Sequence, residues 1–282
     1  MHFKAVAGLV LLTFANQASA SCAYGTILQP RAEGGTVKVN TFGYAGEKGP
    51  ARWINLDPTK NALCTYGTKQ SPIDMTAGSF TVVPGRNLSL SIADRAPGTE
   101  FENLGTTVEV VAKGGNMTFG NVQYTLQQFH FHLPSEHLDN GTSMAMEMHM
   151  VWQGPAGQIA VIGSFIDVND AAGTKNTAIL EDVLGSVEKI ARPGTKTKTG
   201  ALKMSELVNV LSAGSFQTYE GSLTTPPCSE GVRWLVSTQK LAIQLSTFKK
   251  ARSVIGFNSR FLQNNVGTKK PKHNCLGLGI SV

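Results

Sequence analysis

The segment Tyr124–His132 reads YTLQQFHFH, and polar and apolar side chains alternate along its second half. From Gln128 onward every second residue is polar, and the residues between are phenylalanines. Because successive side chains of a β-strand point to opposite faces, this pattern predicts a strand with one polar and one apolar face. The imidazoles of His130 and His132 then lie next to each other on the polar face.

A second segment, Met144–Trp152, alternates in the same way. Glu147, His149 and Val151 fall on one face, and methionines with a tryptophan fall on the other. The apolar run Gln158–Asp167 predicts a third, buried strand. Short β-rich runs separated by Gly and Pro continue along the chain, without an internal repeat or a long linker, and indicate a single, mainly β domain.

Helices are expected in two places. Apolar residues recur at helical spacing over Ile179–Ile190, and the Arg-Pro-Gly sequence at 192–194 predicts the end of that helix. A second short helix is expected to begin at Ser246, whose hydroxyl would cap it. Residues 192–200 are rich in Thr, Lys and Gly, which predicts a loop.

Histidine is rare in this chain, with six in 282 residues, yet four of them fall between His130 and His149. Two imidazoles on one face of a strand can hold a metal ion between them, and a third from an adjacent strand would complete the set. Three neutral imidazoles with an open fourth position describe catalytic zinc, whereas structural zinc sites are closed by four ligands. The alternative is a group of hydrogen-bonded core histidines. The shared face favours a metal.

The first twenty residues have the order of features found in a signal peptide. Lys4 precedes an apolar run from Ala5 to Ala15, and small residues follow at 18–20. We therefore expect a signal peptide at 1–20 and a mature domain at 21–282. The apolar run is too short for a membrane span, and no later stretch is long and apolar enough for one. The expected protein is secreted: extracellular, or periplasmic in a bacterium.

The charge distribution excludes no class of enzyme but argues against nucleic-acid binding. The net charge is +6, and the strongest basic cluster, Lys269–Lys272, has no interleaved aromatic residues. Such a cluster is more typical of a solvated tail than of a nucleic-acid site.

The chain contains four cysteines, at Cys22, Cys64, Cys228 and Cys275. In an exported protein they are expected to form disulfides, because no two of them are as close in sequence as zinc-binding cysteines are. Three pairings are possible, and spacing alone does not choose among them.

Several motifs together resemble the signatures of the alpha carbonic anhydrases. The zinc-site signature is matched by Gln128–His132, Ser135–His137 and Glu147–His149, and the second signature by Ser222–Glu230. Further matches, in the family's order, are Gly43-Tyr44, Gly49-Pro50 with Trp53, Gln70–Asp74, Val232 with Trp234, and Asn258 with Arg260. The matches run from about Phe42 to Gln263.

This resemblance implies a large twisted, mostly antiparallel central sheet with short peripheral helices. It also implies zinc-dependent, reversible hydration of carbon dioxide to bicarbonate and a proton, by attack of zinc-bound hydroxide. The Zn²⁺ ligands would be His130, His132 and His149. The Thr224 hydroxyl would accept a hydrogen bond from the hydroxide and donate its own proton to Glu136, because an ionised carboxylate can only accept.

The resemblance assigns supporting roles as well. Gln128 and Glu147 would hold the far nitrogens of His130 and His149, and such contacts orient a ligand and tune its basicity. An apolar wall beside carbon dioxide would be formed by Val151, Val161, Leu223 and Trp234. Simple core packing is the alternative for these four. Thr225 would help to place bicarbonate, and His137 would be structural.

In exported members of the family, a cysteine before Gln-Ser-Pro-Ile pairs with the one after Thr-Thr-Pro-Pro, which here implies a Cys64–Cys228 disulfide. We also expect a second bridge, Cys22–Cys275, that ties the two ends of the mature chain together.

One departure from the family concerns proton transfer. Thr106 stands where the fastest members carry a histidine that passes the proton to buffer, and threonine does not titrate near neutral pH. We therefore expect slower, buffer-dependent turnover, with Glu109 or a chain of water molecules as possible substitutes. The alternative function is a non-catalytic binding or storage protein on the same fold. The expected partner is the small-molecule substrate, carbon dioxide or bicarbonate, with no nucleic acid and no membrane span, and the protein would be a monomer or a homodimer.

Overall fold

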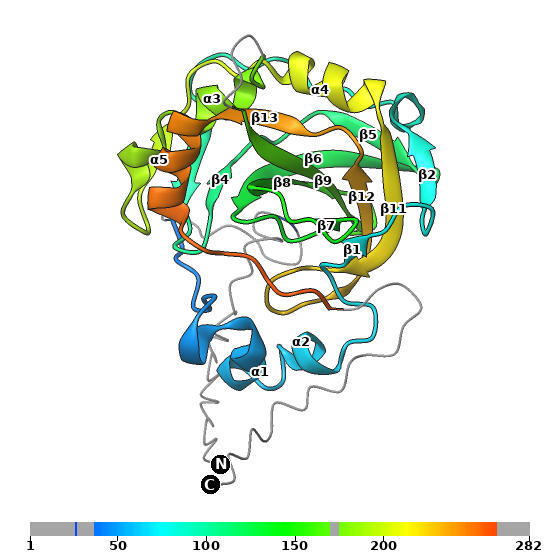
Figure 1. Ribbon diagram of the computed structural model, residues 1–282, viewed down its shortest axis with the longest axis vertical. Coiled ribbons are helices and arrows are strands. Elements are labelled where there is room, and N and C mark those ends of the chain that lie inside the picture. Colours follow the sequence, from blue (N-terminus) through cyan, green and yellow to red (C-terminus); the bar gives the residue numbers. More distant parts are fainter. Residues whose placement is uncertain (1–25, 27–36, 170–174, 264–282) are drawn as a thin grey trace, which may run out of the picture.

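The computed structural model describes residue 26, residues 37–169 and residues 175–263, which are built around a large, strongly twisted β-sheet (Figure 1). The strands are β1 (Asp74–Met75), β2 (Thr81–Pro84), β3 (Glu100–Asn103), β4 (Val108–Val110), β5 (Asn116–Phe119), β6 (Val122–His132), β7 (Leu138–Asp139), β8 (Met146–Gln153), β9 (Ile159–Asn169), β10 (Lys196–Lys198), β11 (Ser215–Ser222), β12 (Glu230–Ser237) and β13 (Leu241–Gln244). The α-helices are α1 (Trp53–Leu56), α2 (Ala62–Tyr66), α3 (Ala178–Leu184), α4 (Met204–Ala213) and α5 (Leu245–Ile255). Short 3₁₀ helices are η3 (Gly46–Lys48), η4 (Pro50–Arg52), η5 (Gly85–Leu88) and η6 (Val187–Ile190).

The main sheet has 11 strands in the order β10-β3-β4-β6-β8-β9-β12-β11-β2, with β5 paired to β6 and β13 paired to β9. Only β12 and β13 run parallel to their neighbour β9, and the other pairs are antiparallel. A separate parallel pair joins β1 to β7. The helices lie around the margin of the sheet (Figure 1). The expectation of a mainly β fold with a mostly antiparallel sheet and short peripheral helices is confirmed.

The three strands predicted from the sequence lie side by side in the centre of the sheet. In the register, His130 of β6 faces His149 of β8, and His149 faces Gly163 of β9. Directly opposite residues of an antiparallel pair lie on the same face of the sheet. A register shift occurs between Leu126 and Gln128, before the histidines begin. The alternation therefore places the imidazoles together, as the sequence predicts.

The opposite face of β6 and β8 forms the main hydrophobic core. Seven fully buried side chains from these two strands belong to it: Leu126, Phe129, Phe131, Met146, Met148, Met150 and Trp152. They pack in one cluster with the apolar residues of α3, η6 and α4. Complete burial of a side chain of this size stabilises by about 1.5–3 kcal/mol. This packing fixes the two strands whose other face carries the histidines.

The segment predicted as one helix, 179–190, forms two. The α-helix α3 ends at Leu184, and η6 continues from Val187 with tighter winding. At Gly185 between them, a Cβ would lie 2.5 Å from the Glu181 carbonyl oxygen, so the chain passes too closely for a side chain. Apolar periodicity predicted the buried side of this segment correctly, but it did not predict the change from an α-helix to a 3₁₀ helix.

The predicted capping role of Ser246 is wrong. Helix α5 begins at Leu245, directly after β13, and Gln244 is its N-cap without a side-chain capping bond. Glu181 of α3 takes the capping role, because its Oε1 accepts the Gln244 N–H at 2.8 Å and its Oε2 accepts the Thr247 hydroxyl. Tertiary contact replaces the local cap.

The predicted loop at 192–200 contains the edge strand β10. It pairs antiparallel with β3, with Thr197 opposite Phe101, and Lys196 Nζ lies 2.8 Å from Glu100 Oε2. Pairing at a sheet edge depends on the neighbouring backbone, which this Lys- and Thr-rich sequence does not reveal.

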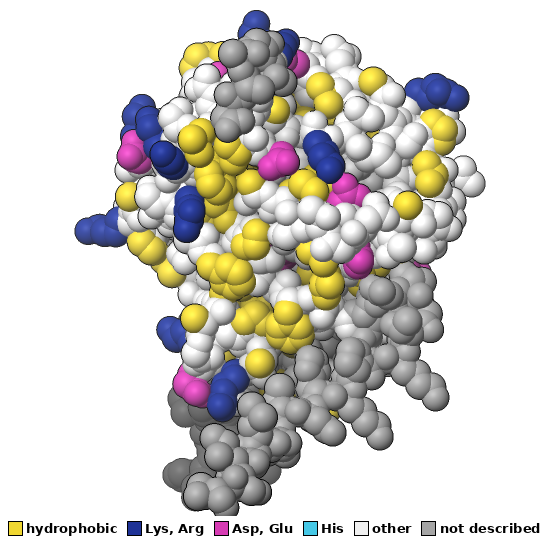
Figure 2. Space-filling view, in the orientation of Figure 1, with side chains coloured by type: hydrophobic (Ala, Val, Ile, Leu, Met, Phe, Trp, Pro, Cys, Tyr) yellow, Lys and Arg dark blue, Asp and Glu magenta, His cyan; other side chains and the backbone are white. Residues whose placement is uncertain are grey.

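The signal peptide at 1–20, the basic cluster at 269–272 and the expected Cys22–Cys275 bridge lie outside the described residues. Within those residues, no helix has the length and apolar character required to cross a membrane. Lys and Arg side chains are spread among apolar ones on the face in Figure 2, and no histidine is visible there. All four described histidines are fully buried.

Candidate metal centre

Three imidazoles meet on the polar face of the central strands. His130 and His132 come from β6 and His149 from β8. Their ring centroids are 4.5–5.4 Å apart, and one potential ligand nitrogen from each ring lies within 4.8 Å of the others. The two strands, held in register by their backbone, bring together the three histidines that the sequence predicts as a metal site.

Each ring is oriented by a hydrogen bond from its outer nitrogen, the ring nitrogen that points away from the centre of the cluster. His130 Nδ1 donates to Gln128 Oε1 at 2.8 Å, as expected from the resemblance. His149 Nε2 donates to Glu147 Oε1 at 2.9 Å, which was also expected. His132 Nδ1 donates to the backbone carbonyl of Asn258 at 2.8 Å. Because a carbonyl or ionised carboxylate oxygen can only accept, these contacts fix the tautomers of the neutral rings.

Two of the remaining nitrogens are available to a metal. His132 Nε2 and His149 Nδ1 are buried and have no hydrogen-bond partner. A buried polar atom without a partner costs free energy, and a native structure calls for an explanation of it. Neutral imidazole nitrogens directed at a common point suit Zn²⁺. In zinc sites the other nitrogen of a histidine ligand typically donates a hydrogen bond to the protein, as it does in all three rings here. The donor set therefore fits the metal that the resemblance implies.

The electrostatics of the cluster keep the rings neutral. Burial lowers the pKa of His132 to about 4 and that of His130 well below its ordinary value, where the neighbouring imidazoles lower it further. Burial also lowers the pKa of His149, although Glu147 opposes this shift. Metal binding requires unprotonated imidazole, so the cluster is ready to coordinate at neutral pH.

The Glu147 carboxylate accepts four hydrogen bonds next to the cluster. Its Oε1 accepts hydrogen bonds from His149 Nε2 and His137 Nδ1 at 2.9 and 2.7 Å, and its Oε2 accepts the backbone N–H groups of Glu136 and His137 at 2.9 and 2.8 Å. Burial alone would raise the pKa of Glu147, but its interactions with His137 and His149 hold it well below its ordinary value. The carboxylate is therefore ionised and locked in orientation.

Glu136 lies beside His132 and His149, and Thr224 contacts it. Glu136 Oε1 is 3.5 Å from His132 Nδ1 and accepts the Arg260 backbone N–H at 2.9 Å. Burial raises the pKa of Glu136 to about 7, while the electrostatic interaction with His149 and a side-chain hydrogen bond with Thr224 act in the opposite direction. A positive ion in the cluster would favour the ionised carboxylate. The pair expected from the resemblance is thus in contact beside the cluster.

Reasoning from the sequence missed three groups that support this site. Asn258 orients His132, and its side chain also binds the backbone of Leu133 and Phe131. The Arg260 backbone holds Glu136. The third group, the Tyr219 hydroxyl, forms a hydrogen bond with His137 Nε2. The only available signal was the position of Asn258 and Arg260 among the family matches, which gives them no role.

Comparisons with known proteins agree with this geometry. Residues 48–274 match the family model described as eukaryotic-type carbonic anhydrase. A carbonic anhydrase of the cyanobacterium Nostoc is 32% identical over 80% of this chain and 83% of its own. The structure of an alpha carbonic anhydrase from Aspergillus oryzae is 35% identical, covers 82% of this chain and 96% of its own, and has a TM-score of 0.77. That of the Thermovibrio ammonificans enzyme in complex with the inhibitor sulfanilamide is 34% identical, covers 79% and 95%, and has a TM-score of 0.67.

The chain belongs to the alpha carbonic anhydrase family. In this carbonic anhydrase family member, the residues expected to line an apolar wall lie in one buried cluster. That cluster contains Val151, Val161, Leu223 and Trp234. The Trp234 ring contacts His149 edge-on at 4.9 Å between centroids. Thr225, also fully buried, follows Thr224 in the same loop.

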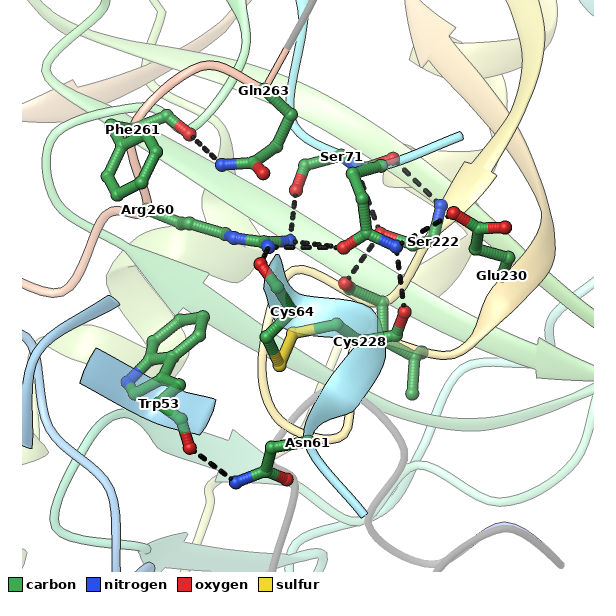
Figure 3. The surroundings of a disulfide bond; sticks show 12 residues. Trp53, Asn61, Cys64, Ser71, Ser222, Cys228, Glu230, Arg260, Phe261 and Gln263 are labelled. Atoms are coloured by element: carbon green, nitrogen blue, oxygen red, sulfur yellow. Dashed lines mark hydrogen bonds between the residues drawn. A yellow bond between two sulfur atoms is a disulfide. The ribbon is translucent and has the colours of Figure 1, made fainter. Parts of the chain in front are cut away.

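The expected Cys64–Cys228 disulfide is present and joins α2 to the loop after Thr224. The buried Arg260 guanidinium lies beside this disulfide, donates to the Cys64 carbonyl and to Ser71, and packs over Trp53 at 5.5 Å (Figure 3). Since the same residue holds Glu136 through its backbone, the disulfide region and the histidine cluster form one connected structure.

Thr106, the residue that the resemblance places at the position of a proton-carrying histidine, is buried. Its Oγ1 accepts a hydrogen bond from Asn40 Nδ2 at 2.5 Å, and its carbonyl accepts one from Asn258. Neither Thr106 nor the two asparagines that bind it titrate near neutral pH. Glu109 lies opposite His130 in the register of β4 and β6 and is fully buried.

Proposed function

We propose that this chain is a zinc-dependent carbonic anhydrase that interconverts carbon dioxide and bicarbonate. The observation that carries the proposal is the pair of buried, unpartnered nitrogens on His132 and His149, in a cluster whose outer nitrogens are all engaged. Family membership supplies the reaction.

The metal would be held by His130 Nε2, His132 Nε2 and His149 Nδ1. Bound Zn²⁺ supplies a Lewis acid that makes water a strong nucleophile at neutral pH, for which carbonic anhydrase is itself the standard example. The protein's own contribution is to hold three neutral rings at fixed tautomers through Gln128 and Glu147, together with the Asn258 carbonyl, so that no proton competes with the metal.

Thr224 would act as the group that orients the reacting oxygen. Its hydroxyl proton goes to Glu136, because the ionised carboxylate can only accept. The Thr224 oxygen then has only lone pairs left for the histidine cluster, so it accepts a hydrogen bond there and rejects groups that cannot donate one. The Arg260 backbone N–H keeps the carboxylate in place.

Carbon dioxide is apolar and would rest against the cluster of Val151, Val161, Leu223 and Trp234. These side chains exclude water from one side of the reacting centre and offer no competing hydrogen bond. Thr225 would help to place the bicarbonate product.

We further infer that the protein is exported and works outside the cytoplasm. The Cys64–Cys228 disulfide supports this location, because disulfides persist in oxidising compartments, and residues 1–20 have the pattern of a signal peptide.

The test is metal analysis followed by stopped-flow hydration of carbon dioxide by the purified protein, with His149→Ala as a matched variant that lacks one ligand. We expect one zinc per chain and hydration activity in the wild type, and loss of both in the variant. Bound zinc without hydration would favour the non-catalytic binding or storage protein. A folded wild type that binds no zinc would refute the proposal.

A further inference from the structure

A chain of hydrogen bonds behind the histidine cluster connects His149 with the segment that precedes Thr224. Its members, in order from the cluster, are His149, Glu147, His137, Tyr219, Ser71 and the backbone of Ser222. All of these residues are buried. The proposed function uses only the first two of them.

The contacts along the chain are short. His137 Nδ1 lies 2.7 Å from Glu147 Oε1, and His137 Nε2 lies 2.7 Å from the Tyr219 hydroxyl oxygen. The Tyr219 oxygen is 2.8 Å from Ser71 Oγ, which in turn accepts the Ser222 backbone N–H at 3.0 Å. Two strands and two loops distant in sequence therefore meet in one hydrogen-bonded row.

The two ends of the row decide the direction of every bond in it. The Ser222 N–H can only donate, and the Glu147 carboxylate at the other end already accepts two backbone N–H groups at Oε2 and His149 at Oε1, which makes it the acceptor for His137 as well. Ser71 Oγ accepts the first hydrogen bond and donates its own O–H to the Tyr219 oxygen. The Tyr219 hydroxyl donates in turn to His137 Nε2. His137 then carries its proton on Nδ1, facing Glu147.

The opposite arrangement leaves a proton without an acceptor. If His137 carried a proton on Nε2 and Tyr219 donated to Ser71, the Ser71 proton would have no acceptor among the described contacts; if Ser71 donated instead, the Tyr219 oxygen would receive bonds from both His137 and Ser71. Among the described residues the Tyr219 hydroxyl has no third hydrogen-bond partner, so its own proton would be buried and unpaired. Such an unmet donor is disfavoured in a protein interior.

We propose that the Tyr219 hydroxyl is a positioning group for the metal site, which holds His137 in the Nδ1–H tautomer and thereby keeps Glu147 turned toward His149. The proposal rests on the function proposed above in taking Zn²⁺ as the ion. Tyr219 touches neither the ion nor the substrate, and it acts on His149 through two intervening side chains.

Packing alone is the competing role for Tyr219. Its ring is parallel to the Trp234 ring, at 6.1 Å and 9°, and Trp234 contacts both His137 and His149 edge-on, at 4.7 and 4.9 Å. The substitution Tyr219→Phe keeps this ring and removes only the hydroxyl, so it separates the two roles. Tyr124→Phe is the matched control, because Tyr124 is buried in the main core on the other side of the sheet.

The first measurement is the zinc dissociation constant of each folded variant, obtained by competition with a chelator. We expect Tyr219→Phe to weaken zinc binding about 10-fold, the lower end of the range for losing a group that orients a metal ligand. Tyr124→Phe should bind zinc as the wild type does. Equal affinity in all three proteins would overturn the positioning role. A wild type without zinc affinity would count against the proposed function instead.

The second measurement is the ¹⁵N spectrum of the histidine side chains in the metal-free protein, which reports the tautomer of His137 directly. We expect only the Nδ1–H form in the wild type and a mixture of tautomers in Tyr219→Phe. The wild-type spectrum decides even if the variant fails to fold, because a His137 whose proton is on Nε2 instead of Nδ1 contradicts the direction of the row.

Discussion

Replacing Glu147 by glutamine keeps the size of the side chain and exchanges one acceptor oxygen for a donor. In the structure Oε2 accepts two backbone N–H groups, of Glu136 and His137, and Oε1 accepts His137 Nδ1 and His149 Nε2. The amide has one oxygen, so it can serve only one of these two pairs of donors.

Either orientation of the amide opposes zinc binding. If its oxygen stays with the backbone pair, its NH₂ group faces the two rings, and a neutral His149 must carry its proton on Nδ1, the nitrogen that the metal needs. If the oxygen turns to the rings instead, two buried N–H groups lose their acceptor, at about 1–3 kcal/mol each. In this second orientation the free energy of zinc binding is less favourable by about 2–6 kcal/mol, which corresponds to a loss of about 30-fold or more in affinity.

The assay is chelator competition on metal-free Glu147→Gln, with urea unfolding of the same protein. We expect the zinc dissociation constant to rise at least about 30-fold. The free energy of unfolding should fall by less, about 1–3 kcal/mol for one unmet buried donor, because the metal-free His149 ring can take the Nδ1–H tautomer whereas Tyr219 opposes the same change in His137. Glu100→Gln, the same change at a surface ion pair with Lys196, is the control. An unchanged zinc affinity in the folded Glu147→Gln protein would refute the four-donor role of this carboxylate.

Three further predictions follow from the surroundings of the cluster. Gly163→Ala should weaken zinc binding about 10-fold, because its Cβ would lie 2.8 Å from Glu147 Oε1 and displace the carboxylate; Gly200→Ala, with open space around it, is the control, and equal affinities would contradict the prediction. Thr106→His should raise hydration rates in dilute buffer by supplying a group with a pKa near 6.5, whereas Thr106→Asn should not; a wild-type rate that is independent of imidazole concentration would count against a missing proton carrier. The metal-free protein should lose stability as the pH falls from about 6.5 to about 4, since the pKa of His132 is lowered to about 4 in the folded state, so the unfolded chain takes up the proton first. This group alone contributes about 3 kcal/mol above pH 6.5. The other two imidazoles act in the same direction, and the buried carboxyl group whose pKa is raised to about 7 opposes them. Urea unfolding at about pH 7.5 and about pH 5 measures the balance, and equal or greater stability at the lower pH would show that the opposing group wins.

The sequence pattern predicted local structure correctly wherever a single repeat, of two residues in a strand or 3.6 in a helix, determines which side chains are neighbours and which are buried. The alternation in Tyr124–His132 and Met144–Trp152 predicted two strands, their apolar faces and the three imidazoles on the polar side, because side-chain direction in a strand follows directly from position. The same reasoning predicted the buried stripe of 179–190 and missed its break at Gly185, where the constraint is a close backbone contact.

The sequence by itself determined which residues could serve a metal site, through the alternation of its strands and the motifs it has in common with a known family. Only the tertiary structure decided what orients them. The Asn258 carbonyl reaches His132 across 126 residues of chain, Tyr219 reaches His137 across 82, and Glu181 caps a helix 66 residues away. These contacts depend on how the strands are ordered and how the loops return to the sheet, and no local period encodes them. The tautomer of each metal-binding ring is therefore a property of the folded chain.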